Sequence, residues 1–501
     1  MTRRTACLLA ALCLLVLSGA AQGLRRALIR SFFIDGPHGV APVLTGQLTA
    51  GSGLAAAARV RVVLLDGLGR EHTAGLPALR ALCEAGLDLV VDVGFPTVSL
   101  PVQHVLWTGL TQQQSGIQYR VSGLDPPVRI GLPGRIQDSQ AVAESHAEIV
   151  HSFAFGKVLP SRTQSPHEGV AWRHHGFQQA ALELARSDVR LGFVHVLRID
   201  EAGHQAGPQT ASYRQAAQQA DALLSALVAE DRRTHPAGGT AWFVLSDHGH
   251  RRGGGHGDAE DEVRLVRACI AGIVPTGPLP PGRSIHLVDL ARALAEAAGV
   301  PRETEAAGRT LSVALDHPER GATLPRPSAI RWAIALLVLV ASFALGVRAV
   351  PRAWAVPLWL PLACACVVAL DGPPTLSSRA VYAPMGRNML VGASPGLLLL
   401  LATMILGLRC TSAPRLATAQ LALPVGAAVA VLVLCGALER IARLSLHPPL
   451  VPFWTGRASL LLTLCFSGAA VAALPVLVAA VRGPSDPSAR AAGAGRGVSA
   501  P

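Results

Sequence analysis

Carboxylate and imidazole side chains follow short apolar runs in the first half of the chain. Asp66 comes directly after the run 62–65, and Asp247 and His248 come after the run 243–245. Ligands of α/β proteins bind outside the carboxyl ends of the strands, so we expect these side chains to face one crevice. Oxygen and imidazole ligands together suit zinc or manganese. Each residue on its own is equally typical of a turn or a helix cap.

Two more segments and a serine extend this pattern. Asp200 and His204 lie four residues apart, a spacing that allows both to bind one metal. His256 stands between glycines, which let the backbone approach a site closely. Ser99 precedes a proline by two residues, as at the first turn of a helix. A hydroxyl at a helix N-terminus lies beside free N–H groups that favour a phosphate, although a polar loop or a plain serine cap also fits these segments.

An α/β domain between about residues 25 and 325 would position these groups, because short apolar β-rich runs alternate there with helical patterns. The predicted strands are Val60–Leu65, Leu89–Val93, Gly192–Leu197 and Ala241–Leu245. The predicted helices are Pro77–Ala85, Tyr213–Glu230 and Leu287–Ala298.

Apolar stretches flank this polar region on both sides. The run Ala6–Gly23 follows two arginines and is either a signal peptide or an uncleaved anchor. Five stretches follow residue 325, at about Ile330–Val347, Trp354–Leu370, Gly396–Leu408, Leu416–Leu438 and Ala458–Val481. The predicted organisation is an anchor or signal peptide (1–24), an exported catalytic domain (25–325), a membrane domain of about five helices (326–482) and a disordered tail (483–501).

Composition agrees with a mosaic of soluble and membrane parts, since the hydrophobic fraction is 50%. The net charge of +12 comes from scattered arginines, which indicates membrane-flanking charge rather than nucleic-acid binding. More arginines flank the apolar stretches on the side of the N-terminus, so the catalytic domain is predicted on the extracytoplasmic side: periplasmic, extracellular or luminal. Of nine cysteines, only Cys83 and Cys269 fall in the polar half, which allows one disulfide and no paired-cysteine metal site.

The segments together resemble the alkaline phosphatase superfamily, in its type I phosphodiesterase and nucleotide pyrophosphatase branch. That branch carries strand-Asp-Gly, Pro-Thr-x-[Ser/Thr]-x-Pro-x-x-His, Asp-x-x-Gly-His-x-x-Gly-Pro, Asp-His-Gly and Gly-His-Gly, and all five occur here in order across residues 62–257. The resemblance implies an alkaline-phosphatase-like α/β domain, with a mainly parallel sheet flanked by helices, followed here by a C-terminal transmembrane helical bundle.

The resemblance also implies two divalent metals, zinc or alternatively manganese, that clamp the attacking and leaving oxygens of a displacement at phosphorus. Ser99 takes the nucleophile position, with Thr97 as the alternative, and a covalent phospho-Ser intermediate would follow. One metal would be held by Asp200, His204 and His256, and the other by Asp66, Asp247 and His248.

One position departs from the nucleotide pyrophosphatase pattern. Those enzymes usually supply a phosphate-binding Asn shortly after the segment that matches Ser115-Gly116-Ile117, whereas this chain continues Gln-Tyr-Arg120. The Arg120 guanidinium would fit phosphate oxygens, and a surface arginine is the alternative. A sulfatase is disfavoured, because the segment after Ser99 lacks the arginine of the sulfatase motif.

The order of parts resembles the glycosylphosphatidylinositol ethanolamine phosphate transferases, whose membrane part is usually larger. We therefore predict a phosphoethanolamine-type transferase that acts on a phospholipid or glycolipid. One alternative is a phosphodiesterase or nucleotide pyrophosphatase that hydrolyses its substrate. Another is an inactive protein whose membrane bundle is the functional part. No nucleic-acid partner is expected, and the sequence predicts no oligomeric state.

Overall fold

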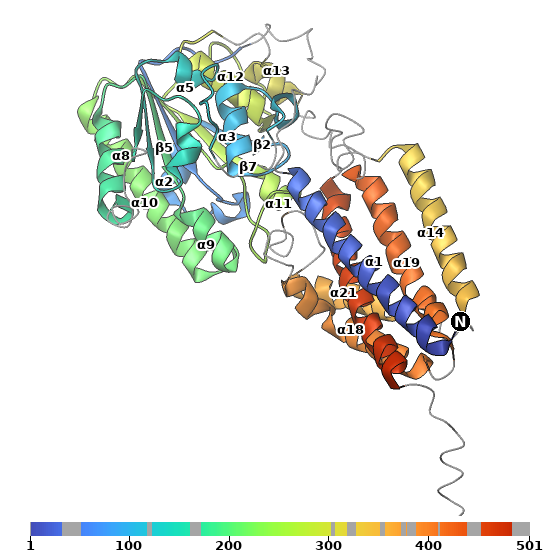
Figure 1. Ribbon diagram of the computed structural model, residues 1–501. Coiled ribbons are helices and arrows are strands. Elements are labelled where there is room, and N and C mark those ends of the chain that lie inside the picture. The colour runs from blue at the N-terminus through green and yellow to red at the C-terminus, as the bar shows by residue number, and fades with distance from the viewer. Residues whose placement is uncertain are drawn as a thin grey trace, which may run out of the picture.

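The computed structural model describes residues 2–32, 52–117, 123–160, 172–301, 306–317, 327–350, 356–371, 377, 387–408, 411–437 and 452–482. It consists of an α/β domain and a bundle of long helices beneath it (Figure 1). The N-terminal helix α1 (Arg3–Phe32) belongs to the bundle, although the α/β domain separates it in sequence from the other long helices.

The α/β domain is built on one eight-stranded sheet with the order β4-β3-β5-β1-β6-β7-β2-β8. All neighbouring strands are parallel except β7, which runs antiparallel to β6 and β2. The strands are β1 (Arg59–Leu65), β2 (Leu87–Asp92), β3 (Ser139–Ala143), β4 (Lys157–Leu159), β5 (Leu191–Val196), β6 (Thr240–Leu245), β7 (Leu265–Ala271) and β8 (Ser284–His286). The four predicted strands are present as β1, β2, β5 and β6.

Helices cover both faces of this sheet, so the domain has three layers. Along β1, Val60, Val62 and Leu64 enter one apolar core while Val63 and Leu65 enter the other, as the alternation of side chains in a strand requires. The first core includes α3 (Ser99–Thr108), α12 (Leu287–Ala297) and α13 (Leu311–Asp316). The second includes α2 (Pro77–Glu84), α8 (Phe177–Arg186) and α10 (Ala211–Thr234). The predicted fold of a mainly parallel sheet flanked by helices is confirmed.

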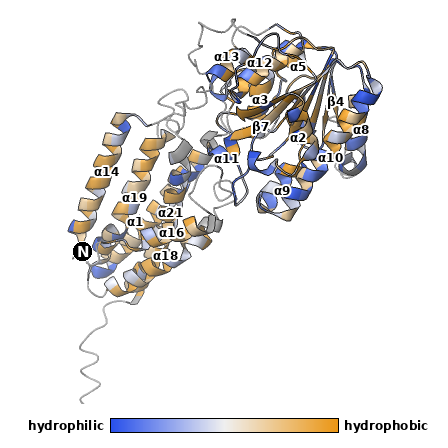
Figure 2. Cartoon of the chain, turned by 180° about the vertical axis from the view of Figure 1, so that it is seen from behind, coloured by the Kyte–Doolittle hydropathy of each residue, from blue (hydrophilic) through white to orange (hydrophobic). Residues whose placement is uncertain are grey.

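The bundle contains the predicted apolar stretches as helices. They are α1, α14 (Ala329–Ala349), α16 (Trp359–Asp371), α18 (Arg387–Gly407), α19 (Ala413–Cys435) and α21 (Pro452–Arg482). Among the described residues, five helices are long and apolar enough to cross a membrane, and α16 is shorter. Figure 2 shows hydrophobic residues along the outside of the bundle, which indicates an integral membrane protein. The third stretch is longer than predicted, because α18 begins at Arg387 and continues through Pro395.

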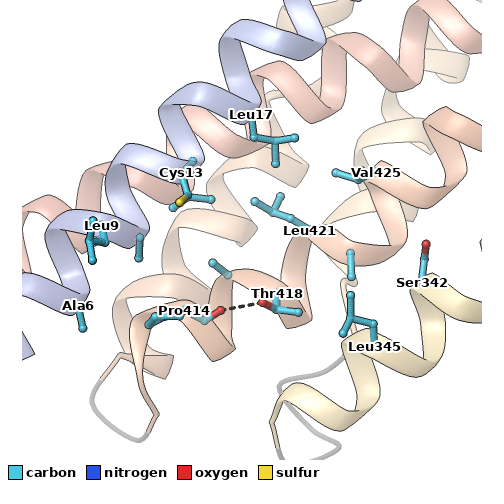
Figure 3. Close-up of a pocket in the computed structure, with 14 residues that line it drawn as sticks. Ala6, Leu9, Cys13, Leu17, Ser342, Leu345, Pro414, Thr418, Leu421 and Val425 are labelled. Atoms are coloured by element: carbon cyan, nitrogen blue, oxygen red, sulfur yellow. Dashed lines mark hydrogen bonds between the residues drawn. The ribbon is translucent and has the colours of Figure 1, made fainter. Parts of the chain in front are cut away.

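Helix α1 packs along α21, and Ser18 Oγ on α1 donates a hydrogen bond to the carbonyl of Phe466 at 3.0 Å. Toward its N-terminal half, α1 lines a cavity of about 510 Å³ together with α14 and α19 (Figure 3). Leu9, Leu345 and Leu421 contribute to its apolar lining. The cavity lies far from the α/β domain, so it is separate from the predicted catalytic residues.

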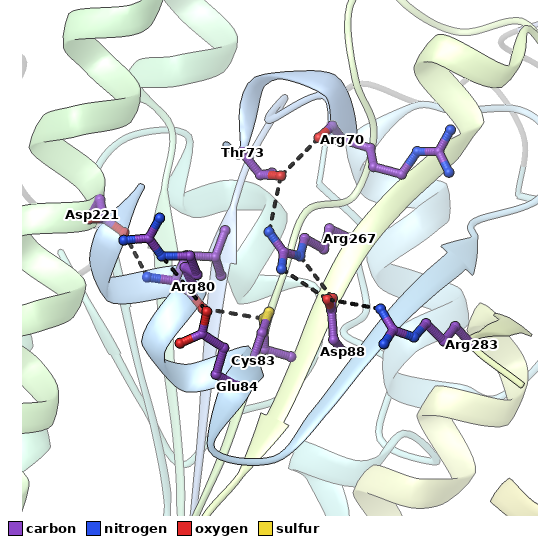
Figure 4. The surroundings of a disulfide bond; sticks show 11 residues. Arg70, Thr73, Arg80, Cys83, Glu84, Asp88, Asp221, Arg267 and Arg283 are labelled. Carbon is purple, nitrogen blue, oxygen red and sulfur yellow. Dashed lines mark hydrogen bonds and ion pairs between the residues drawn. A yellow bond between two sulfur atoms is a disulfide. The ribbon is translucent and has the colours of Figure 1, made fainter. Parts of the chain in front are cut away.

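A disulfide joins Cys83 at the end of α2 to Cys269 in β7, with the Cα atoms 4.7 Å apart. The pairing that the sequence allowed is therefore present. Nearby, Arg267 makes two hydrogen bonds to the carboxylate of Asp88, at 2.8 and 2.9 Å (Figure 4). The disulfide thus ties β7 to helix α2, and the ion pair ties β7 to its neighbour β2.

Candidate metal centre

The six predicted metal ligands converge at one edge of the sheet. They lie at or just beyond the carboxyl ends of β5, β1 and β6, which are neighbours in the sheet. In each predicted set the potential ligand atoms lie within 4.8 Å of one another. The first set is Asp200, His204 and His256, and the second is Asp66, Asp247 and His248.

The first set is organised around one carboxylate oxygen. Asp200 and His204 share helix α9 (Arg198–Ala206), and Asp200 Oδ1 lies 3.3 Å from His204 Nε2 and 3.6 Å from His256 Nε2. The Nε2 atoms of the two histidines are 3.1 Å apart. His256 Nδ1 lies 2.6 Å from the carbonyl of Thr97, so Nδ1 donates its proton there and Nε2 keeps a lone pair. This is the tautomer that a metal ligand requires.

The second set is fully buried. Asp66 Oδ1 and Asp247 Oδ2 lie 3.4 and 3.7 Å from His248 Nε2. Neither oxygen has a hydrogen-bond partner, and no ion pair joins either carboxylate to an arginine or lysine among the described residues. Buried carboxylate oxygens without a partner are costly, and these two unpaired oxygens beside one imidazole are the observation that fits this donor set to a divalent cation.

Electrostatics agree with this interpretation. Burial, followed by the neighbouring carboxylates, raises the pKa of Asp66, and burial raises the pKa of Asp247 to about 6. Burial lowers the pKa of His248 to about 3, so its imidazole is neutral at neutral pH. Two carboxylates that resist ionisation beside a neutral imidazole form a site that a cation would stabilise.

Two histidines in the centre were not predicted from the sequence. His195 on β5 is buried, and its Nε2 donates a hydrogen bond to Asp66 Oδ2 at 2.7 Å. His250 accepts a hydrogen bond on Nδ1 from the Gly255 N–H at 3.2 Å, which leaves its proton on Nε2, 3.0 Å from Asp200 Oδ1. His250 also forms a third possible ligand group with Asp200 and His248, whose ligand atoms lie within 4.8 Å of one another, but a protonated Nε2 offers no lone pair. His195 is therefore placed to orient Asp66, whereas the contact of His250 with Asp200 is a close approach without a hydrogen bond.

Glycines allow the carboxylates and histidines to approach this closely. Gly67 has φ +73°, and a Cβ there would lie 2.7 Å from Asp200 Cα. Tyr213 holds this turn, since its hydroxyl donates to the Gly67 carbonyl at 2.7 Å. A Cβ on Gly203 would lie 2.4 Å from the His250 ring. The glycines of the Asp-Gly and Asp-x-x-Gly-His segments are thus required by packing within the centre.

The two candidate nucleophiles differ in their surroundings. Ser99 is the first residue of α3, and its Oγ lies 3.3 Å from His248 Nε2, beside the second ligand set. Thr97 is fully buried, and its hydroxyl donates to the Asp258 carbonyl and accepts from the Gly257 N–H, both at 2.8 Å. Because the Thr97 hydroxyl is engaged in positioning the loop that carries His256, the geometry favours Ser99. Arg120 lies outside the described residues.

The centre faces the membrane bundle. Val98 belongs to the apolar cluster of the bundle helices, and Phe95 packs against that cluster. Ser377, between α16 and α18, accepts a hydrogen bond on Oγ from the Asp258 N–H at 2.9 Å and donates one to Glu260 Oε2 at 2.7 Å. Helix α11 (Asp261–Arg264), which follows Glu260 in the sequence, lies at the junction of the α/β domain and the bundle (Figure 1). The segment just before Ser99 and the segment just after His256 therefore both contact the membrane part of the chain.

Comparison with known families agrees with this geometry. Residues 144–260 match the family model of type I phosphodiesterase / nucleotide pyrophosphatase. The matched segment contains every predicted metal ligand except Asp66. The resemblance to the type I phosphodiesterase branch is thereby confirmed. The resemblance to the glycosylphosphatidylinositol ethanolamine phosphate transferases is not among these findings and stays a prediction.

Several solved structures are similar to this chain at low identity. Murine ectonucleotide pyrophosphatase / phosphodiesterase 5 is 16% identical, with 49% of this chain and 97% of that chain covered and a TM-score of 0.34. A protein of the alkaline phosphatase superfamily from Vibrio parahaemolyticus is 13% identical, with 58% and 78% covered and a TM-score of 0.36. A 2-O GAG sulfatase is 14% identical, with 52% and 74% covered and a TM-score of 0.40. Among curated proteins, none matches the sequence.

Proposed function

We propose that this protein is a two-metal transferase that moves a phosphoethanolamine-type group between membrane lipids or glycolipids. The observation that supports a lipid substrate is the position of Ser99: the residue before it, Val98, packs into the apolar cluster of the bundle. A lipid held in the membrane beside the bundle is present at a high effective concentration near the centre. The proposed catalytic domain is 25–325 and the proposed membrane domain 326–482.

The proposed chemistry begins with Ser99. Its Oγ attacks the phosphorus of the donor, a bond forms between Oγ and phosphorus, and the bond from phosphorus to the donor's glyceride oxygen breaks. The leaving oxygen takes up the proton that the Ser99 hydroxyl releases, and the phosphoethanolamine group stays on Ser99 as a diester. An acceptor hydroxyl then attacks the same phosphorus, its oxygen bonds to phosphorus, the bond to Ser99 Oγ breaks, and Oγ takes up the acceptor's proton. The position of Ser99 at the first turn of α3 supports this role, because free N–H groups there favour a phosphate.

Each ligand set has a distinct proposed part. Asp66, Asp247 and His248 would hold a cation beside Ser99, and the set containing Asp200 would hold the second cation. Bound divalent cations, zinc or manganese, would lower the pKa of the attacking hydroxyl and stabilise charge on the leaving oxygen. His195 keeps the Asp66 carboxylate oriented for this task through its hydrogen bond to Oδ2.

Export of the α/β domain is part of the proposal. The Cys83–Cys269 disulfide supports it, because disulfides persist in oxidising compartments outside the cytoplasm. The arginine distribution beside the spans agrees with the same orientation.

A hydrolase is the second candidate, and the match to the type I phosphodiesterase / nucleotide pyrophosphatase family favours it. In that case water instead of an alcohol would release the phosphoryl group from Ser99. The same ligands and nucleophile serve both reactions, so the acceptor is what separates them.

The test uses full-length protein in detergent or bilayers with labelled phosphatidylethanolamine and with a nitrophenyl phosphodiester. We expect label to move to an added glycolipid or alcohol acceptor, at a rate that depends on the acceptor. Rapid release to water that is independent of acceptor would overturn the transferase and leave the hydrolase. Full activity of Ser99→Ala on either substrate would exclude the proposed nucleophile.

A further inference from the structure

Arg25 is a buried cation in the membrane bundle. It lies on α1, is 3% exposed, and its Nε and Nη2 atoms have no hydrogen-bond partner. The next residue, Arg26, carries the same charge at the same level of the helix but is exposed. Burial therefore distinguishes Arg25 from an ordinary arginine at the end of a membrane span.

The position of Arg25 on α1 explains its burial. Buried residues recur on α1 at a heptad spacing, and α1 packs along α21. One row of them is Cys7, Leu14, Ala21 and Leu28, and the other is Ala11, Ser18 and Arg25. The Ser18 hydroxyl donates a hydrogen bond to the Phe466 carbonyl, whereas two nitrogens of the Arg25 guanidinium have no hydrogen-bond partner. An unpaired charge between membrane helices is costly and marks a ligand site.

The two unsatisfied nitrogens define the chemistry of the ligand. Nε and Nη2 lie on the same edge of the planar guanidinium, and their N–H bonds run parallel. This edge matches two oxygens of one phosphate or carboxylate group. The missing partner is thus an anion with two adjacent oxygens.

The depth of Arg25 in the bundle identifies which anion is available. Arg25 is three residues before Leu28, where the candidate span ends, so it lies about 4.5 Å along the helix from that end. The 26-residue span is about 39 Å long, which exceeds a hydrocarbon core of about 30 Å, so Arg25 reaches the level of the lipid headgroups. Basic pockets between helices at this level bind lipid phosphates.

The same end of the bundle adjoins the metal centre. Leu28 belongs to the apolar cluster that also contains Val98, the residue before Ser99. We propose that Arg25 binds the phosphate of a membrane phospholipid in the leaflet that adjoins the α/β domain. The identity of that lipid as a substrate rests on the proposed function, whereas the binding site itself does not.

The test measures lipid binding without turnover. Full-length Ser99→Ala protein is delipidated and titrated with phosphatidylethanolamine in detergent micelles, and bound lipid is counted by native mass spectrometry. Adding Arg25→Gln should weaken binding about tenfold or more, since it removes two charge-assisted hydrogen bonds. Arg25→Lys keeps the positive charge but loses the two parallel N–H donors, so we expect its lipid affinity to lie between those of the parent and of Arg25→Gln. The matched control Arg26→Gln should bind within about twofold of the parent.

Three results would overturn the inference: equal binding by the Arg25→Gln and Arg26→Gln proteins, an unchanged affinity of Arg25→Lys, or displacement of the lipid by millimolar inorganic phosphate. A second measurement guards against misfolding of the variants. Phosphatidylethanolamine should raise the unfolding temperature of the parent and of Arg26→Gln, and should do so less for Arg25→Gln. If binding depends on Arg25 but the wild-type protein transfers nothing from this lipid, the inference holds and the proposed function fails.

Discussion

Ser377 Oγ accepts a hydrogen bond from the backbone N–H of Asp258 at 2.9 Å, and Asp258 lies two residues after the candidate metal ligand His256. The Asp258 carbonyl in turn accepts from the hydroxyl of Thr97, two residues before Ser99. A residue between two bundle helices is thus connected through one loop to both a metal ligand and the candidate nucleophile. We expect catalysis in the α/β domain to depend on the bundle for this reason.

Replacing Ser377 tests that dependence. Ser377→Ala leaves the buried Asp258 N–H without its acceptor, so the loop that carries His256 should lose order and kcat should fall about fivefold or more. Ser377→Thr keeps the hydroxyl and should restore most of the rate. Steady-state kinetics on the nitrophenyl diester, with metal content measured in parallel, would separate kcat from KM.

The control for Ser377 is Ser394→Ala, a serine on α18 whose hydroxyl bonds only within its own helix. It should leave kcat unchanged. An equal loss in both variants would assign the effect to general destabilisation of the bundle.

Asp200 should be required for metal binding, because its Oδ1 lies close to the Nε2 atoms of His204 and His256. We expect wild-type protein to bind about two divalent cations per chain, and Asp200→Asn about one or fewer, by elemental analysis. Asp316→Asn, at an exposed position on α13, should keep the wild-type content. Wild-type protein that binds less than one cation after metal exchange would contradict the two-metal centre.

His195 should tune the second ligand set without binding a metal itself. His195→Leu removes the N–H that Asp66 Oδ2 accepts, and we expect metal affinity to fall about 10- to 100-fold, as for other outer partners of metal ligands. His195→Gln can place an amide N–H near the same point and should recover part of that loss. Calorimetric metal titration is the measurement, and similar affinities for both variants would refute the orienting role.

Ser99 and Thr97 should respond oppositely to loss of their hydroxyls. Ser99→Ala should abolish formation of a phosphoenzyme while leaving the unfolding temperature near the wild-type value. Thr97→Val should lower stability by about 1–3 kcal/mol, because it leaves the buried Gly257 N–H without an acceptor. Trapping of labelled phosphoprotein and thermal unfolding would show the contrast. A label retained in Ser99→Ala would make Thr97 the nucleophile.

Metal affinity of the second set should fall as the pH is lowered below about 6. Burial raises the pKa of Asp247 to about 6 in the metal-free protein, so below that pH the carboxyl is protonated and must release its proton before a cation binds. Each proton released reduces the apparent affinity about tenfold per pH unit. Titrations at pH 5 and pH 7, in buffers of different ionisation enthalpy, should show more proton release at the lower pH, because Asp247 is protonated there. Equal release at both would contradict the raised pKa of Asp247.

Local patterns were sufficient to predict the scaffold and to single out six side chains that the fold brings together. The strand preceding Asp66 is a continuous apolar run, and a parallel strand buried on both faces has that composition. Asp200 and His204 are four residues apart, which places them on one face of α9. The count of cysteines outside the apolar stretches allowed one disulfide, but only the structure shows that Cys83 and Cys269 are paired.

Contacts between distant segments were not predictable in the same way. His195 pairs with Asp66 across 129 residues, and its only local signal is a histidine inside an apolar strand. Ser377 meets Asp258 across 119 residues, and nothing in its own segment marks it. In the sequence, Arg25 resembles an ordinary arginine beside a membrane span, and only the packing of α1 shows that it is buried. The type of each residue was visible in the sequence, but its partner depended on the three-dimensional arrangement.

The side chain of His204 is 47% exposed, whereas those of Asp66, Asp247 and His248 are completely enclosed. Of the two sets, the first is therefore the one with a ligand open to solvent. We expect a cation held by Asp66, Asp247 and His248 to exchange slowly. A chelator should therefore remove the cation of the exposed first set before that of the buried second set. With both positions occupied, this difference in enclosure would make one cation readily replaced and the other retained.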